Sequence, residues 1–163
     1  MAKKIVTKED ALQRLSALCS RSEQCEYDVN RKMLNWGISL ADRVKVLEFL
    51  IDNRYVDDTR FAKSFVNDKA KFSSWGPYKI KLELSKKRIK PDVISEAIKK
   101  IDNRIWREGL MKCAIAKARN LDLCCEDSWQ NRQKLYKYLI SRGFPSSSSG
   151  KIVSFIINQQ NNS

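Results

Sequence analysis

The sequence contains no histidine and only five glycines among its 163 residues. Without histidine the chain lacks the side chain that most often moves protons near neutral pH, and the common mixed cysteine–histidine zinc sites are excluded. The few glycines form no Gly-rich phosphate loop. The carboxylates at Asp57, Asp58, Glu83 and Asp92 have the spacing of helix caps and surface positions rather than of a metal-dependent nuclease. We therefore predict that the protein is not an enzyme and needs no metal or cofactor.

Long apolar runs are also absent from the sequence. No stretch reaches the roughly 18 apolar residues that a membrane-spanning helix needs, and Lys3 and Lys4 lead into no signal-peptide core. We therefore expect a soluble, cytoplasmic protein without membrane contact. The cysteines are odd in number and lack C-x-x-C spacing, which predicts reduced thiols rather than a disulfide framework. They are Cys19, Cys25, Cys113, Cys124 and Cys125.

Acidic side chains become scarce toward the C-terminus. The chain has 32 basic and 19 acidic residues, which gives a net charge of +13. Residues 1–60 carry 11 basic and 10 acidic side chains (11 − 10 = +1), residues 61–127 carry 16 and 9 (16 − 9 = +7), and residues 128–163 carry 5 and none (+5). Clustered basic charge attracts polyanions or an acidic protein surface. The pattern predicts such a partner and says nothing about the fold.

A helical pattern occurs three times along the chain. The copies span Val29 to Ile38, Ile80 to Ile89 and Leu135 to Phe144, so they begin 51 and then 55 residues apart. Each has apolar residues at i and i+4, followed by an apolar residue just after the expected helix end. A period near fifty with helical spacing is typical of helical-repeat proteins.

We predict an all-α fold, an elongated tandem array of three three-helix repeats at residues 1–54, 55–103 and 104–163. No strand pattern competes with it. The expected helices lie at about 8–20, 26–35 and 41–53, then from about 58 through Ala70, then at 77–87, 91–101, 105–118, 131–141 and 149–158. We expect the serine run at 146–149 to form a loop and cap, and residues 158–163 to form a fraying polar tail.

Several residues mark where these helices begin, end and pack. Thr7 and Asp10 predict a capping box, Gly37 predicts a left-handed helix end, and Pro77 suits the first position of a helix. The third helix is expected to bury Val44, Leu47, Leu50 and Ile51.

The segment from Tyr55 to Val66, YVDDTRFAKSFV, is followed after nine residues by Gly76-Pro77. This spacing of Asp-Asp, Arg-Phe-Ala and Gly-Pro resembles the central signature of the RecX family of bacterial regulatory proteins, and the Arg142–Phe144 tripeptide is similar to that family's closing repeat. The resemblance extends from about residue 11 to residue 157. It implies tandem three-helix repeats and a protein that binds the RecA–DNA filament and inhibits the ATPase, recombinase and coprotease activities of RecA. It also implies binding to single- and double-stranded DNA.

Two residues depart from the family pattern. Arg88 stands where a glycine is common after the central helix, and a left-handed turn kept there would cost about 1 kcal/mol. Cys25 stands where a capping serine is common, with Asp28 as its reciprocal partner, so we expect a weaker cap.

We predict that most of the signature is structural. Asp57 and Asp58 are expected to cap a helix rather than bind metal, and Arg60 to form a local ion pair, although a role in recognition stays open. The apolar members of the signature recur at the spacing of the buried face of a helix, which predicts that they lie in the core. The full set is Asp57, Asp58, Arg60, Phe61, Ala62, Phe65, Val66, Gly76, Pro77, Ile80 and Leu84.

Two basic patches are predicted to bind DNA or the RecA filament. Lysine outnumbers arginine in the first, which favours contact with backbone phosphates without sequence specificity. Trp75 and Tyr78, interleaved with it together with Phe72, are candidates for stacking on bases, although Trp75 could instead staple a repeat junction. The first patch is Lys69, Lys71, Lys79, Lys81, Lys86, Lys87, Arg88 and Lys90; the second is Arg132, Lys134, Lys137 and Arg142. Helix phase decides whether they face the same side.

Three functions remain open at this point. The leading one is a monomeric regulator that docks on the RecA filament. The second is a DNA-binding helical-repeat protein without a recombinase partner, and the third is a scaffold that holds an acidic protein. The sequence does not separate binding along the filament groove from capping of the filament end.

Overall fold

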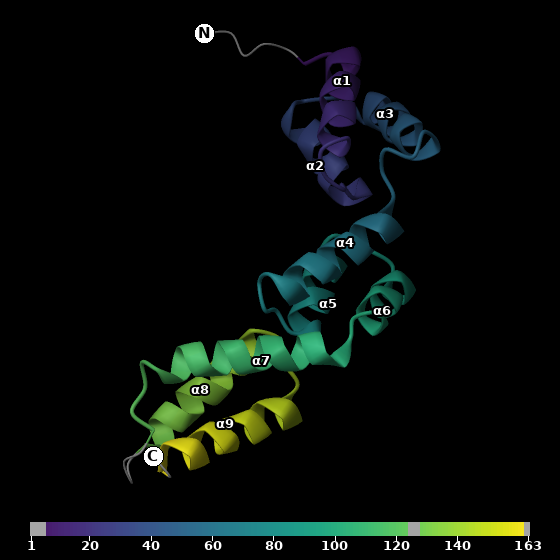
Figure 1. The fold of residues 1–163 in the computed structure, drawn as a ribbon. Coiled ribbons are helices and arrows are strands. Elements are labelled where there is room, and N and C mark those ends of the chain that lie inside the picture. Colours follow the sequence, from purple (N-terminus) through teal and green to yellow (C-terminus); the bar gives the residue numbers. More distant parts are fainter. Residues whose placement is uncertain (1–5, 124–127, 162–163) are drawn as a thin grey trace, which may run out of the picture.

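The computed structural model describes residues 6–123 and 128–161, and over these residues the chain forms nine α-helices and no strand. Figure 1 shows three successive groups of three helices along an elongated molecule. The predicted all-α array of three three-helix repeats is confirmed. The helices are α1 (Lys8–Cys19), α2 (Glu26–Asn35), α3 (Leu40–Asp52), α4 (Asp58–Lys71), α5 (Pro77–Lys86), α6 (Pro91–Lys99), α7 (Asn103–Ala118), α8 (Trp129–Ser141) and α9 (Ser146–Asn161).

Each group of helices has its own hydrophobic core. The first core gathers around Met33, the second around Leu84 and the third around Leu139, and all three side chains are fully buried. Helix α7 contributes to two cores, because Trp106 packs against the second while Leu110 belongs to the third. The repeat limits at 54/55 and 103/104 therefore stay a prediction.

The local signals for helix ends are confirmed. The backbone N–H of Asp10 donates to Thr7 Oγ1 at 3.1 Å, and the N–H of Thr7 donates to Asp10 Oδ2 at 3.3 Å, so the capping box is present. Gly37 has φ +78° and Arg88 has φ +60°. Arg88 therefore keeps the left-handed turn without glycine, at a cost of about 1 kcal/mol. Pro77 occupies the start of α5.

The predicted loop at residues 146–149 is wrong, and the last helix is longer than predicted. The fraying of the polar tail at 158–163 stays a prediction, and residues 162 and 163 lie outside the described part of the chain. The serines at 146–149 form the first turn of α9, in which the N–H of Ser149 donates to Pro145 O at 2.9 Å, and the helix continues to Asn161. Serine often bonds to its own backbone outside helices, so its composition alone indicated a loop. In the structure the buried Val153 and Ile157 anchor α9 in the third core.

Helix α3 buries only part of the predicted set: Leu50 is buried as predicted, whereas the buried Val46 was not predicted. Val46 and Leu50 are buried, whereas Val44 and Ile51 are 46% and 37% exposed and Leu47 is half-buried. The helix carries two apolar stripes, and the exposed one, at positions 40, 44, 47 and 51, has the more regular helical spacing. Periodicity therefore indicated Leu50 correctly but also Val44 and Ile51, and contact with α1 and α2 decides which positions are buried.

The second and third repeats meet through their backbones. The N–H of Gly76 donates to Arg142 O at 2.7 Å, and the N–H of Tyr78 donates to Gly143 O at 3.0 Å. Both N–H groups lie at the start of α5, where the helix itself offers no acceptor. A Cβ added to Gly76 would overlap the carbonyl of Gly143, and one added to Gly143 would overlap the backbone of Lys79. The contact therefore requires glycine at both positions.

The first and second repeats meet through side chains. At the start of α2, Cys25 is fully buried and makes no capping hydrogen bond, as expected; Asp58 Oδ1 accepts from the N–H of Glu26 at 2.9 Å. Lys87 Nζ, after the end of α5, forms an ion pair with Asp28 at 2.5 Å. Burial raises the pKa of the Cys25 thiol to about 12, so the thiol stays protonated. In both junctions the end of one helix meets the start of another: α8 meets α5 through backbone hydrogen bonds, and α5 meets α2 through an ion pair.

Gly76→Ala should lower the free energy of unfolding by about 1–3 kcal/mol, because a methyl group forced into this backbone contact pushes the repeats apart. Gly76 has φ −78°, so alanine adds no backbone strain and the loss isolates the contact. Urea denaturation followed by circular dichroism measures it. Gly150→Ala is the control, since its Cβ meets nothing within 4 Å in α9 and should stabilise by about 0.5–1 kcal/mol. If Gly76→Ala is as stable as the wild type, the contact is not required.

Candidate nucleic-acid interface

The solvent face of α5 carries lysine and aromatic side chains together. Tyr78, Lys81, Leu82 and Lys86 recur at helical spacing and are exposed, Tyr78 by 62% and Leu82 by 56%. Lys86 pairs with Glu83 at 2.8 Å, an exposed contact that contributes little to stability. Lys81 has no ion-pair partner among the residues that the structure describes. Positive charge and an aromatic ring are therefore both presented to solvent here.

Trp75 is half-buried and contacts three side chains. Its ring lies edge-on to Phe65, with 6.3 Å between ring centroids. Lys69 Nζ lies 5.0 Å and Lys79 Nζ 4.4 Å from the centroid of the Trp75 ring. Each cation–π contact contributes about 0.5–1 kcal/mol at a partly exposed site. All three partners belong to the second repeat, so both roles left open for Trp75 stay predictions, and stacking on a base would first require a lysine to leave.

Three members of the first basic patch lie at the junction of the first and second repeats. The half-buried Lys87 is held by Asp28. The guanidinium of Arg88 lies 5.6 Å from the centroid of the Tyr27 ring. Arg88 and Lys90 remain exposed, whereas the charge of Lys87 is used within the fold.

The second basic patch begins on α8 and ends at Arg142. Its members on α8 are the half-buried Arg132 and the exposed Lys134 and Lys137. The guanidinium of Arg142 donates to the carbonyl oxygens of Ser73 and Ser74, the latter at 3.3 Å. Arg142 therefore belongs to the junction of the second and third repeats.

Arg142, a member of the second basic patch, contacts the loop that carries Trp75 of the second repeat. Its guanidinium lies on the α4–α5 loop beside Trp75, and Lys69 and Lys79 lie over the ring of that tryptophan. The structure thus gathers three predicted cations, Lys69, Lys79 and Arg142, around one loop. Lys87 is held instead at the other junction.

One aromatic residue was named in the sequence analysis but not chosen as a stacking candidate. Phe72, the C-cap of α4, is 77% exposed and follows Lys71, whose side chain is also exposed. The signal in the sequence is an aromatic residue that falls outside the buried stripe of its helix. Trp129, at the start of α8, is 68% exposed in the same way.

The signature residues hold the second repeat together. Asp57 Oδ1 accepts from the N–H of Arg60 at 2.9 Å and so caps α4. Arg60 forms its ion pair with Glu23 of the first repeat at 2.7 Å rather than with the adjacent carboxylates. Most of the apolar members are buried in the second core: Phe61, Ala62, Val66, Ile80 and Leu84, with Phe65 half-buried beside them.

Comparison with known proteins supports the resemblance. A family model for the second three-helix domain of RecX matches residues 57–98. The regulatory protein RecX of Clostridium botulinum (strain Alaska E43 / Type E3) is 32% identical over 124 residues, which are 76% of this chain and 58% of the relative. That of Prosthecochloris aestuarii is 28% identical over 136 residues, 83% of this chain and 86% of the relative. The chain belongs to the RecX family.

Solved RecX structures share the fold. A crystal structure of a regulatory protein RecX superposes with a TM-score of 0.76 at 23% identity, over 89% of this chain and 70% of that one. RecX from Lactobacillus salivarius superposes with a TM-score of 0.71 at 22% identity, over 95% and 96% of the two chains. The alignment spans less than two thirds of the clostridial RecX relative.

Among the described residues of this RecX chain, no group of three or more cysteine, aspartate or glutamate side chains is arranged to hold a metal ion. No helix in that part is long and apolar enough to cross a membrane.

The stability of the first junction should depend on pH through Asp58. Burial raises the pKa of the Asp58 carboxyl; the N–H of Glu26 opposes this, and the charge of Asp57 adds to it. A raised pKa means that the folded state binds the proton more tightly than the unfolded state. This contribution to the free energy of unfolding is therefore largest below the usual aspartate pKa of about 4 and is lost as pH rises through the higher folded pKa.

Asp58→Asn removes this titration and keeps an oxygen that can accept from Glu26. Urea denaturation midpoints at pH 7 and pH 5 should therefore differ less in the variant than in the wild type. Asp68→Asn, which changes an exposed carboxylate on the same helix, is the control. An Asp58→Asn variant with the pH dependence of the wild type would contradict the assignment.

Variants at Lys81 and Lys87 should show that one lysine serves DNA binding and the other the stability of the fold. Lys87→Gln leaves the half-buried Asp28 without its partner and should cost about 1–3 kcal/mol of stability, with little change in affinity for single-stranded DNA. Lys81→Gln should leave stability within about 0.5 kcal/mol and weaken DNA binding severalfold, because exposed lysine contacts phosphate. Urea denaturation and fluorescence anisotropy measure the two effects. The reverse pattern would contradict this division of roles.

Proposed function

We propose that the chain regulates the RecA recombinase: it binds the RecA–DNA filament and inhibits the ATPase, recombinase and coprotease activities of RecA. The observation that carries this proposal is an elongated three-repeat array, of the RecX family, whose second and third repeats present exposed lysines and aromatic rings. An extended positive surface suits a long nucleoprotein groove.

The charge distribution supports a contact with DNA backbone. The basic surplus lies in residues 61–163, and residues 1–60 are almost neutral. Lysine side chains contact phosphate without reading bases, so the binding to single- and double-stranded DNA is not sequence-specific. Exposed Phe72 and Tyr78 offer surfaces on which unpaired bases stack. The protein acts as a monomer in the cytoplasm, where it meets RecA on DNA.

The decisive experiment titrates the protein into the single-stranded-DNA-dependent ATPase reaction of the cognate RecA at two salt concentrations. Inhibition should saturate below one molecule per RecA protomer and weaken at higher salt, since phosphate contacts release counterions. Unchanged ATPase with intact DNA binding by anisotropy would favour a DNA-binding repeat protein without a recombinase partner. If the protein neither inhibits the RecA ATPase nor binds DNA, but binds an acidic protein, the scaffold function would be favoured.

Charge reversal tests which surface acts. A variant with Lys71, Lys81 and Lys86 changed to Glu should lose inhibition and DNA binding by tenfold or more. Its control changes Lys63, Lys99 and Lys100 to Glu, which alters the net charge equally at exposed lysines outside the predicted patches. Equal loss in the two variants would indicate that net charge, and not this surface, is responsible.

A further inference from the structure

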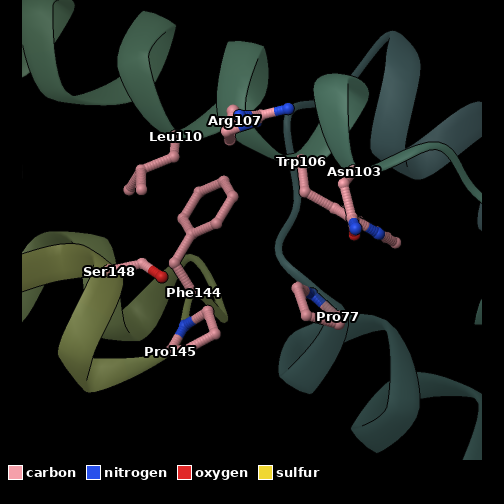
Figure 2. A pocket seen from close by; sticks show the side chains of 8 residues that line it. All are labelled: Pro77, Asn103, Trp106, Arg107, Leu110, Phe144, Pro145 and Ser148. Atoms are coloured by element: carbon pink, nitrogen blue, oxygen red, sulfur yellow. The ribbon is translucent and has the colours of Figure 1, made fainter.

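A cavity of about 560 Å³ lies between α7, the start of α5 and the turn that joins α8 to α9 (Figure 2). The ring of Phe144 points from that turn toward α7, and the half-buried Trp106 and Pro77 stand beside it. The cavity exists because the backbone contact at Gly76 and Gly143 brings Pro77 and Phe144 next to α7. Its volume is in the range of about 300–1,000 Å³ that is typical of small-ligand sites.

Among the residues that line this cavity, Arg107 carries the one charge, and Asn103 and Ser148 are polar but neutral. Arg107 and Asn103 lie at its exposed edge, and no acidic residue lines it. Arg107 has no ion-pair partner in the part of the chain that the structure describes, because the neighbouring carboxylate, Asp102, pairs with Arg104 at 2.9 Å. Arg104, and to a smaller degree Arg107, lower the pKa of the Asp102 carboxyl, but no carboxylate of the described residues lies within ion-pair distance of the exposed guanidinium of Arg107, which remains available to an anion. The cavity therefore suits a ligand with a flat apolar part and an attached anion.

We propose that this cavity binds one unstacked base of single-stranded DNA. A nucleotide matches three features of the cavity. The half-buried Trp106 offers an apolar face for the base beside the buried Phe144, the amide of Asn103 can bind a polar base edge, and the guanidinium of Arg107 can bind a phosphate. Pro77 directly precedes Tyr78 on the exposed face of α5, so a strand that stacks there continues toward the cavity. The inference rests on the DNA contact of the proposed function and adds a specific base site.

Occupation of the cavity would join two repeats. Pro77 begins α5 of the second repeat, whereas Phe144 belongs to the third. A base held between them stabilises the junction, so bound single-stranded DNA should protect the backbone N–H groups of Gly76 and Tyr78 against hydrogen exchange. Double-stranded DNA, whose bases remain paired, should not give this protection.

Photo-crosslinking tests the site directly. An oligonucleotide with a single 5-iodouracil is irradiated with the full-length protein, and the crosslinked peptide is identified by mass spectrometry. The expected crosslinks are to Trp106 or Phe144, and Ser148→Trp, which fills the cavity, should abolish them. That variant should also weaken binding of a base-bearing oligonucleotide about fivefold or more while leaving binding of an abasic one unchanged.

A matched pair of arginine variants supplies a second readout if Ser148→Trp fails to fold. Arg107→Gln should weaken binding of the base-bearing oligonucleotide severalfold, and Arg119→Gln, at the exposed C-terminal end of α7 and outside the cavity, should not. Crosslinks confined to Tyr78 or Phe72, with equal affinity in the two arginine variants, would overturn the base site and leave the DNA interface standing.

Two further outcomes are distinguishable from these. If the wild-type chain binds no DNA at all, the DNA contact of the proposed function fails, and the base site fails with it. If an acidic peptide with an aromatic residue binds the wild type, is excluded by Ser148→Trp, and displaces no DNA, the cavity is a peptide site and the base proposal is overturned.

Discussion

The close backbone contact of Gly76 with Gly143 is the constraint on which the rest of the array depends. It places two carbonyl oxygens of the third repeat against N–H groups at the start of α5, which would otherwise have no protein partner. The same contact puts the guanidinium of Arg142 on the α4–α5 loop, beside the lysines that surround Trp75. The contact of Arg142 with the α4–α5 loop and the cavity beside α7 both depend on the absence of side chains at Gly76 and Gly143.

The first junction is built differently and should respond to different conditions. Its contacts are the Lys87–Asp28 and Arg60–Glu23 ion pairs and the capping of α2 by Asp58. Interactions between charged side chains weaken with salt and change with pH, whereas the backbone hydrogen bonds from Gly76 to Arg142 and from Tyr78 to Gly143 do neither to the same degree. The orientation of the first repeat is therefore the adjustable one, and the second and third repeats behave as one unit.

Much of the fold could be predicted because its signals are local. A capping box at Thr7 and a proline at position 77 act within one helical turn, and the three apolar repeats fix the number of helices. The face of α3 could not be predicted, since the helix carries two apolar stripes and only its packing chooses between them. Lys87 and Arg142 were assigned to DNA because their partners lie 59 and 68 residues away, a distance at which no sequence pattern shows the pair.

Some basic side chains make contacts within the fold, so the net charge of the chain overstates the charge that is available to a polyanion. The net charge of +7 over residues 61–127 includes Lys87, which is neutralised by Asp28, and Lys69 and Lys79, which stand over Trp75. The charge left for a polyanion lies on exposed side chains of α5, α7 and α8, among them Lys81, Arg107 and Lys134. Because the first repeat is nearly neutral and joined by adjustable contacts, it is suited to contact protein while the other two repeats contact DNA. Under the proposed function, a regulator of a nucleoprotein filament needs both kinds of surface, and we expect them on different repeats of this chain.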